Sequence, residues 1–135
     1  LDKKTYLLGI CVGMQMLFES SEEGNLKGLG LIKGKVIKFL NSDRNYPVPH
    51  MGWNTINIKK KSSILNLNEK FIRFYFAHSY YCVCKDEKNI LATTNYSINF
   101  TSAVADNNIF GVQFHPEKSH DYGKKILKKF LMTNV

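Results

Sequence analysis

A single cysteine stands between two glycines near the start of the chain, in the stretch Gly9-Ile10-Cys11-Val12-Gly13. An apolar run precedes this stretch and a helix-like pattern follows it, as at a nucleophile elbow, where a strand turns sharply into a helix. The helix N-terminus would favour a thiolate, and the amide of Val12 would point at a developing oxyanion. We predict that Cys11 is a nucleophile; a small buried cysteine is the structural alternative.

A cysteine nucleophile needs a base, and the base needs a group that orients it. His115 ends an apolar, strand-like run and is followed by Pro116 and Glu117. Proline favours an extended backbone at the residue before it, so we expect the side chains of His115 and Glu117 to project to one side. The carboxylate could then hold one ring nitrogen while the other faces the thiol. The sequence thus predicts a catalytic triad of Cys11, His115 and Glu117, unless the segment only ends a strand at the surface.

The other three histidines are weaker candidates for chemistry. His50 and His78 have no carboxylate near them in sequence, so we expect hydrogen-bonding roles in a loop or in the core. His120 lies five residues after His115, but nothing supplies a third ligand. We therefore predict neither a metal site nor a cofactor.

Composition narrows the functional class. A length of 135 residues with 44% hydrophobic residues predicts one globular domain, residues 1–135, without a membrane-spanning run. The net charge is +8, but Arg44 and Arg73 are the only arginines among 19 basic residues, and the lysines are dispersed. This pattern argues against a nucleic-acid partner. Three cysteines make no disulfide framework and suit a reducing compartment, so we expect a cytoplasmic protein.

Hydrophobic patterning predicts which elements carry the candidate residues. We expect helices over residues 14–23 and 121–135, the second of them amphipathic, with Tyr122, Ile126, Leu127, Phe130 and Leu131 on its apolar face. The expected strands cover residues 5–11, 34–40, 55–60, 70–84 and 89–97, followed by a hairpin in 101–115 that turns at 106–108. Residues 41–54 are expected to form a loop. This order predicts an α/β domain with a mixed sheet flanked by helices.

With both halves of the triad in place, the chain resembles the class I glutamine amidotransferases. "GICVGMQ" is similar to the nucleophile motif of that family and "GVQFHPEKS" to its His-x-Glu motif. The resemblance narrows to the family of glutaminase subunits of imidazole glycerol phosphate synthase, and "PHMGWN" discriminates best. The other similar segments are "SEEGNLKGLGLIKGKVIKF", "YFAHSYY" and "ATTNY". Members of the family carry further strands and a glycine-rich oxyanion loop before the nucleophile strand, so we expect this chain to be a fragment lacking those N-terminal strands and nearly inactive alone.

The resemblance implies a reaction, a substrate site and a partner. Cys11 would attack the side-chain amide of glutamine, and the ammonia released would pass to a (β/α)8 barrel cyclase subunit in a heterodimer. The residues whose positions match the substrate site are Val12, Gln15, His78, Ser79 and Tyr80. The positions that match the partner interface are His50, Trp53, Tyr75 and Lys118.

Three alternatives remain open at this point. A paralogous amidotransferase would supply ammonia to another acceptor, such as a sugar in surface-polysaccharide synthesis. A cysteine peptidase or other acyl-transferring hydrolase could use a similar elbow, although "PHMGWN" argues against it. A truncated, inactive domain would only bind its partner.

Overall fold

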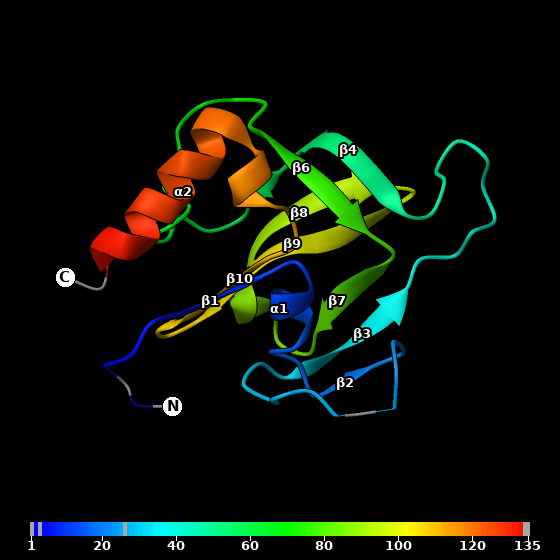
Figure 1. Cartoon of the computed structure of the whole chain (residues 1–135), viewed down its shortest axis with the longest axis horizontal. Coiled ribbons are helices and arrows are strands. Elements are labelled where there is room, and N and C mark those ends of the chain that lie inside the picture. Colours follow the sequence, from blue (N-terminus) through cyan, green and yellow to red (C-terminus); the bar gives the residue numbers. More distant parts are fainter. Residues whose placement is uncertain (1, 3, 26, 134–135) are drawn as a thin grey trace.

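A computed structural model describes residues 2, 4–25 and 27–133 of the chain (Figure 1). The strands are β1 (Leu7–Ile10), β2 (Ser20–Ser21), β3 (Gly34–Lys38), β4 (His50–Thr55), β5 (Asn57–Ile58), β6 (Arg73–His78), β7 (Tyr80–Cys84), β8 (Ile90–Tyr96), β9 (Ile98–Asp106) and β10 (Ile109–Val112). The helices are α1 (Val12–Gln15) and α2 (His120–Thr133), with short 3-10 turns at η1 (Glu87–Asn89) and η2 (Pro116–Lys118).

An eight-stranded mixed sheet forms the centre of the fold. Its strand order is β1-β10-β9-β7-β3-β2, and β8 and β5 join it beside β9. Strand β1, which ends just before Cys11, runs parallel to β10, with Ile10 opposite Val112, whereas β10 and β9 form the predicted hairpin. The two residues that follow Ile10 and Val112 therefore leave the sheet at the same end. The predicted mixed sheet flanked by helices is confirmed.

Apolar side chains cover both faces of this sheet, because neighbouring residues in a strand point to opposite sides. Ile109 belongs to one apolar cluster, which contains Met14 and Phe18 from the segment that begins with α1. Phe110, the next residue, belongs to a larger cluster that includes Ile126 of α2. The segment after Cys11 and the C-terminal helix thus pack against opposite faces.

A second, two-stranded sheet is formed by β4 and β6 (Figure 1). The two strands are antiparallel, with His50 opposite His78 and Trp53 opposite Tyr75. Burial alternates along β6, where Phe74, Phe76 and His78 are buried. One face of this small sheet therefore packs into the core, and the other can carry residues at the surface.

Two strand predictions were wrong in this region. The segment "PHMGWN" was expected to be a loop, but its residues from His50 onward form β4, because β6 pairs with them. Residues 70–84 were expected to form one strand, but the chain breaks at Ser79 and continues as β7 in the other sheet. The break brings the end of β6 and the start of β7 together beside the cysteine.

The helix predictions were right in kind and wrong in extent. Helix α1 covers only Val12–Gln15 rather than residues 14–23, because the loop that follows binds the backbone that would have continued it. The carbonyl of Leu17, for example, accepts hydrogen bonds from the amides of Leu31 and Ile32. Helix α2 begins at His120 as an amphipathic helix, but Leu131 is 69% exposed instead of buried. Residues 134 and 135 of the predicted helix lie outside the described residues.

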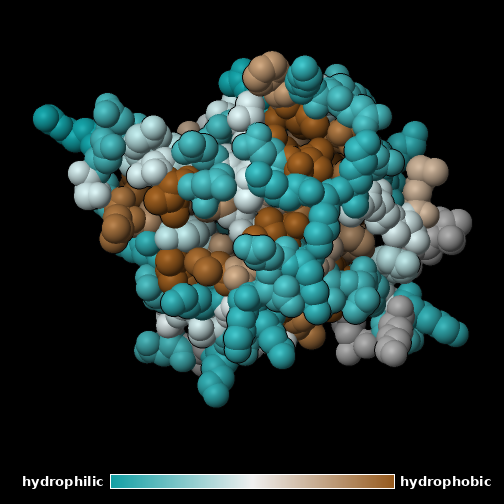
Figure 2. Space-filling model, turned by 180° about the vertical axis from the view of Figure 1, so that it is seen from behind, coloured by the Kyte–Doolittle hydropathy of each residue, from teal (hydrophilic) through white to brown (hydrophobic). Residues whose placement is uncertain are grey.

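The face opposite to that of Figure 1 is largely hydrophilic, with apolar side chains visible in separate patches between polar ones (Figure 2). In the described part of the chain, no helix is both long and apolar enough to cross a membrane.

Candidate active site

The predicted sharp turn from a strand into a helix is present, and its backbone is strained at Cys11. Cys11 has φ 55° and ψ −109°, a conformation that side-chain-bearing residues rarely adopt. The amide of Cys11 donates to the carbonyl of Val112 at 2.8 Å, which fixes the end of β1 against β10. A Cβ on Gly9 would lie 2.5 Å from the carbonyl oxygen of Gly13, whereas a Cβ on Gly13 would meet nothing within 4 Å. Of the two glycines, only Gly9 is required by this packing.

The thiol of Cys11 is buried, with the residue 8% exposed. Its Sγ lies 3.7 Å from the carbonyl oxygen of Ala77 and 3.7 Å from Nε2 of Gln113. Burial raises the pKa of the thiol, as does the negative charge of Glu117, while the amide of Val12 and the side chain of Gln113 act in the opposite direction. Because burial is the largest cause, the resting group is a protonated thiol, and it needs a base to become a nucleophile.

The candidate base and its orienting carboxylate form a direct pair. Nδ1 of His115 lies 2.5 Å from Oε1 of Glu117. As predicted, the backbone of His115 is extended before Pro116, with φ −101° and ψ 98°. Glu117, however, reaches the ring through the 3-10 turn η2 and not through an alternating strand. Since Nδ1 donates to the carboxylate, Nε2 is the nitrogen that can accept a proton.

The fold brings the base to the same edge as the cysteine. Cys11 follows β1 and His115 follows β10, which are parallel neighbours. The amide of His115 donates to the carbonyl of Tyr75 at 2.8 Å, and its own carbonyl accepts from the hydroxyl of Ser119. No hydrogen bond joins Cys11 Sγ to His115 among the described residues, and apo active sites often tighten only when substrate is bound.

A cavity of about 290 Å³ opens at the cysteine. It contains all five residues that the sequence predicts for substrate binding. The lining residues are Cys11, Val12, Gln15, Glu23, Pro49, Met51, Ala77, His78, Ser79 and Tyr80. They come from the elbow, the loop after β2, the start of β4 and the break between β6 and β7. The cavity therefore exists only because these segments, distant in sequence, meet at one end of the sheet.

Two glutamines fix the wall of this cavity next to the thiol. Nε2 of Gln15 donates to the carbonyl of Tyr80 and to Oε1 of Gln113, both at 3.1 Å. Gln113 in turn contacts Cys11 Sγ through its own Nε2. Sequence analysis missed Gln113; its signal was a polar residue in the apolar run "FGVQF", two positions before His115.

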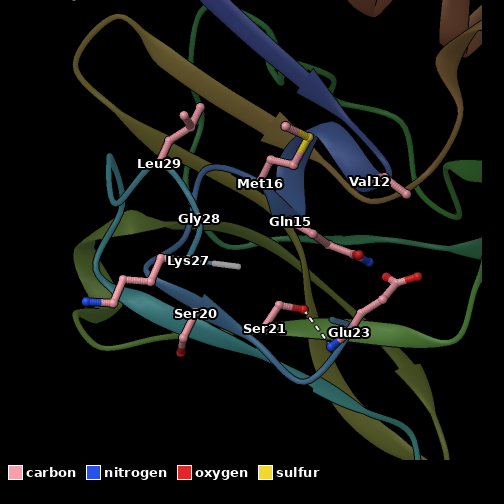
Figure 3. Close-up of a pocket in the computed structure, with 9 residues that line it drawn as sticks. All are labelled: Val12, Gln15, Met16, Ser20, Ser21, Glu23, Lys27, Gly28 and Leu29. Carbon is pink, nitrogen blue, oxygen red and sulfur yellow. Dashed lines mark hydrogen bonds between the residues drawn. The ribbon is translucent and has the colours of Figure 1, made fainter. Parts of the chain in front are cut away.

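Sequence analysis also missed Glu23. Of the described residues that line the cavity, Glu23 alone carries a carboxylate. Glu23 lies after β2, and its only signal was its place in the acidic stretch "ESSEEG" after the elbow. Val12, Gln15 and Glu23 also line a neighbouring cavity of about 310 Å³. In that cavity, the side chains of Gln15 and Glu23 extend into the same space from facing walls (Figure 3).

The residues predicted for a partner interface divide into two groups. Trp53 is 40% exposed and stacks on the ring of His120, with centroids 5.3 Å apart. Tyr75 lies edge-on to Trp53, and Nζ of Lys118 is 6.0 Å from the centroid of the Tyr75 ring. These residues form one aromatic and basic cluster. His50, in contrast, is only 2% exposed, so its side chain points into the core and not toward a partner.

Residues 2, 4–25 and 27–133 contain no group of three or more histidine, cysteine or acidic residues arranged to hold a metal ion. Cys82 and Cys84 are free thiols that pack with the apolar cluster under α1. Burial raises the pKa of both, and neither lines the cavity at Cys11, so we assign them a packing role.

Comparison with known proteins identifies the family. Residues 1–134 match the model of the class-I glutamine amidotransferases. The chain belongs to this family.

Within this family, the chain is similar to curated subunits of imidazole glycerol phosphate synthase. An imidazole glycerol phosphate synthase subunit HisH 2 from Methanococcus maripaludis is 53% identical over 130 residues, which cover 96% of this chain and 64% of that protein. Subunits HisH from Leptospira borgpetersenii and Sulfurimonas denitrificans are 49% and 54% identical and are covered to 65% and 61% of their length. The chain thus spans just under two thirds of these relatives.

Solved structures support the fold alone. PurLQS from Thermotoga maritima has a TM-score of 0.73 at 22% identity, covering 98% of this chain and 63% of that one. A glutamine amidotransferase from the same organism has a TM-score of 0.62 at 19% identity, covering 97% of this chain and 49% of that one.

Proposed function

We propose that this protein hydrolyses glutamine to glutamate and ammonia, as the glutaminase subunit of an imidazole glycerol phosphate synthase. The observation that carries the proposal is a buried cysteine that lines a cavity, on a strained backbone at the sheet edge where the pair of His115 and Glu117 also lies. The relatives named HisH support the choice of this amidotransferase over a paralogue with another acceptor.

The first half of the reaction makes a thioester. Nε2 of His115 takes the proton of the Cys11 thiol, and the sulfur attacks the side-chain amide carbon of glutamine. The tetrahedral oxyanion accepts a hydrogen bond from the amide of Val12, the same group that favours the thiolate. The imidazolium then gives its proton to the leaving nitrogen, the C–N bond breaks, and ammonia departs.

The second half regenerates the thiol. His115 takes a proton from water, which attacks the thioester carbon and releases glutamate, and the proton returns to the sulfur of Cys11. Throughout, Glu117 holds the ring through Nδ1 and stabilises the imidazolium. No other protein group has to change its protonation state.

Substrate recognition follows from the lining of the cavity. Glutamine carries an α-ammonium group that needs an anionic partner, and Glu23 supplies a carboxylate there. Gln15 and the segment of Ser79 and Tyr80 offer amide and backbone groups for the rest of the substrate. We infer that Glu23, Gln15 and this segment hold glutamine with its side-chain amide toward Cys11.

The partner is a (β/α)8 barrel cyclase subunit that consumes the ammonia, in the cytoplasm. The cluster of Trp53, Tyr75, Lys118 and His120 lies on strands β4 and β6 and around η2, and Trp53 follows Met51, a residue that lines the cavity, by two positions on β4. A partly exposed tryptophan such as Trp53 is a typical anchor of a protein interface. Ammonia released at Cys11 would therefore leave close to the partner.

The activity is tested on the complete subunit in complex with its cyclase partner, by measuring glutamate release from glutamine. Cys11→Ser is expected to lower kcat at least about 10,000-fold, since a serine hydroxyl is far harder to deprotonate than a thiol. Cys84→Ser is the matched control and should leave kcat unchanged, because Cys84 does not line the cavity. Undiminished turnover by Cys11→Ser would refute the proposal.

The interface is tested by Trp53→Ala, measured as the Kd between the two subunits. We expect Kd to rise roughly 30-fold, in the range of an aromatic anchor of an interface. Phe71→Ala is the control, since Phe71 is an exposed aromatic in the loop before β6, outside the aromatic and basic cluster. Equal losses of affinity in both variants would argue against this surface.

A further inference from the structure

A row of hydrogen bonds that the mechanism does not use runs from β4 to the wall of the cavity. Nδ2 of Asn54 lies 3.2 Å from Nε2 of His50, and Nδ1 of His50 lies 2.9 Å from Nε2 of His78. Nδ1 of His78 lies 2.7 Å from the carbonyl oxygen of Tyr80. We call this row, from Asn54 through the two imidazoles to the Tyr80 carbonyl, the histidine chain. Its two rings are 2% and 5% exposed.

The position of every proton in the histidine chain follows from its ends. A backbone carbonyl can only accept, so Nδ1 of His78 must carry hydrogen. Burial lowers the pKa of His78 to about 4 and that of His50 to about 3, so both rings are neutral near pH 7. Nε2 of His78 therefore accepts from Nδ1–H of His50. Nε2 of His50 then accepts from the amide of Asn54, whose other hydrogen goes to the carbonyl of Asn95.

The surroundings hold the first ring in one orientation. The His50 ring stacks between Phe76, with centroids 4.7 Å apart, and Tyr96, with centroids 4.0 Å apart. Its chain neighbours Pro49 and Met51 line the cavity at Cys11. A clamped ring of fixed tautomer can set the position of its partner more closely than an exposed polar group could.

The histidine chain ends on the atom that organises the cavity wall. The Tyr80 carbonyl accepts from both His78 and Gln15. Gln15 also donates a hydrogen bond to Oε1 of Gln113, and the amide of Gln113 contacts the thiol of Cys11. A shift of the Tyr80 carbonyl would therefore displace Gln15, a candidate contact of glutamine, and loosen the surroundings of the nucleophile.

We propose that His50 is a positioning residue for glutamine hydrolysis: through His78 it fixes the Tyr80 carbonyl and, with it, the glutamine subsite. His50 touches neither the substrate nor the reacting atoms and acts only through the histidine chain. The inference rests on the proposed glutaminase activity. Its tests therefore include one readout that does not depend on turnover.

That readout is the tautomeric state of the two rings. In the complete subunit bound to its cyclase partner, labelled with ¹⁵N-histidine, long-range ¹H–¹⁵N spectra should show His50 and His78 as neutral Nδ1–H tautomers from pH 6 to 8. Free neutral imidazole mainly carries its hydrogen on Nε2, so this signature is specific to the histidine chain. An Nε2–H tautomer at either ring, or titration of either ring near pH 6.5, would overturn the proposal even if glutamine is hydrolysed normally.

The kinetic test compares two replacements of the same ring in the same complex. His50→Phe keeps the stack but removes the donor to His78, and should raise the KM for glutamine roughly tenfold with a smaller fall in kcat. His50→Asn places an amide N–H near the original Nδ1, and should keep KM within about threefold of the parent value. A KM unchanged in His50→Phe, or equally raised in His50→Asn, would overturn the proposal.

A matched control separates positioning from general loss of stability. Thr94→Val removes the buried hydrogen bond from Thr94 Oγ1 to Ser102 Oγ, 2.9 Å long, which lies outside the histidine chain. We expect it to lower the melting temperature without raising KM, and an equal rise in KM would overturn the proposal. If the parent complex hydrolyses no glutamine, the proposed function fails, and the spectra still decide the tautomers independently.

Discussion

The two halves of the candidate triad are built in opposite ways. Cys11 is buried on a strained backbone that depends on the absence of a side chain at Gly9. His115 and Glu117 lie on an unstrained segment, with side chains 19% and 46% exposed. Packing therefore sets the position of the nucleophile, whereas a local side-chain pair sets that of the base. Substitutions that disturb the packing around Cys11 should therefore lower the stability of the fold. Substitutions of His115 or Glu117 should mainly slow proton transfer.

The sharpest separation of the two halves comes from His115→Gln. We expect kcat for glutamine to fall roughly 1,000- to 10,000-fold, because the thiol loses its base. The free energy of unfolding should stay within about 0.5 kcal/mol of the parent, since the side chain is partly exposed and pairs with the more exposed Glu117. Glutamate release and urea denaturation measure the two quantities. A large loss of stability would show that the base half is also held by packing.

Gly9→Ala should lower the stability of the fold, which His115→Gln leaves almost unchanged, and should lower kcat less than His115→Gln does. The added Cβ would clash with the Gly13 carbonyl, so the free energy of unfolding should fall by about 2–3 kcal/mol and kcat roughly 100-fold. Gly13→Ala is the matched control and should resemble the parent in both measurements, because its Cβ enters open space. If both variants behave alike, the elbow does not depend on the close approach at Gly9.

Glu117→Gln tests how much the exposed orienting group contributes. We expect kcat to fall about 10- to 100-fold, less than for His115→Gln, because solvent can partly replace a carboxylate at this exposure. The variant also removes a charge that raises the pKa of the Cys11 thiol. Alkylation of Cys11 should therefore gain its full rate at a slightly lower pH. A shift of this profile to higher pH would contradict the geometry.

The stability of the fold against pH depends on the two buried histidines, His50 and His78. The folded pKa values of His50 and His78, about 3 and about 4, lie below the ordinary value of 6.5. Between pH 4 and 6.5 the unfolded chain therefore binds more protons, and stability falls as pH is lowered through this window. Each histidine contributes up to about 1.4 kcal/mol per pH unit, and nothing above pH 6.5.

Urea denaturation between pH 4.5 and 7 measures this slope. His50→Asn should reduce it by the share of one histidine. An unchanged slope in His50→Asn would mean that His50 is not held neutral by burial.

Local patterns were enough to predict the backbone turn at Cys11 and the pairing of His115 with Glu117, but not the cavity walls around them. The elbow at Cys11, the pair of His115 and Glu117, and the turn between β9 and β10 are each encoded within a few residues. Strand β4 could not be predicted, because its hydrogen-bonding partner β6 lies some 20 residues away and "PHMGWN" lacks β-like alternation.

The residues missed in the site share that cause. Gln113 and Glu23 matter only because the fold places them at Cys11, and the break at Ser79 matters because β6 and β7 join different sheets. A short sequence pattern predicts only the structure of the residues next to it. The cavity could not be predicted in this way, because its walls come from four separate segments of the chain. The burial of His50 is another example, since its ring is enclosed by Phe76 and Tyr96 from other strands.

The central claim is that the sulfur of Cys11 attacks the side-chain amide carbon of glutamine. The most direct measurement is peptide mapping by mass spectrometry after the complete subunit, bound to its partner, reacts with a chloroketone analogue of glutamine. We predict a single label, on Cys11, which glutamine suppresses by competition. Labelling of Cys82 or Cys84 in place of Cys11, or labelling of Cys11 that glutamine does not suppress, would contradict the account.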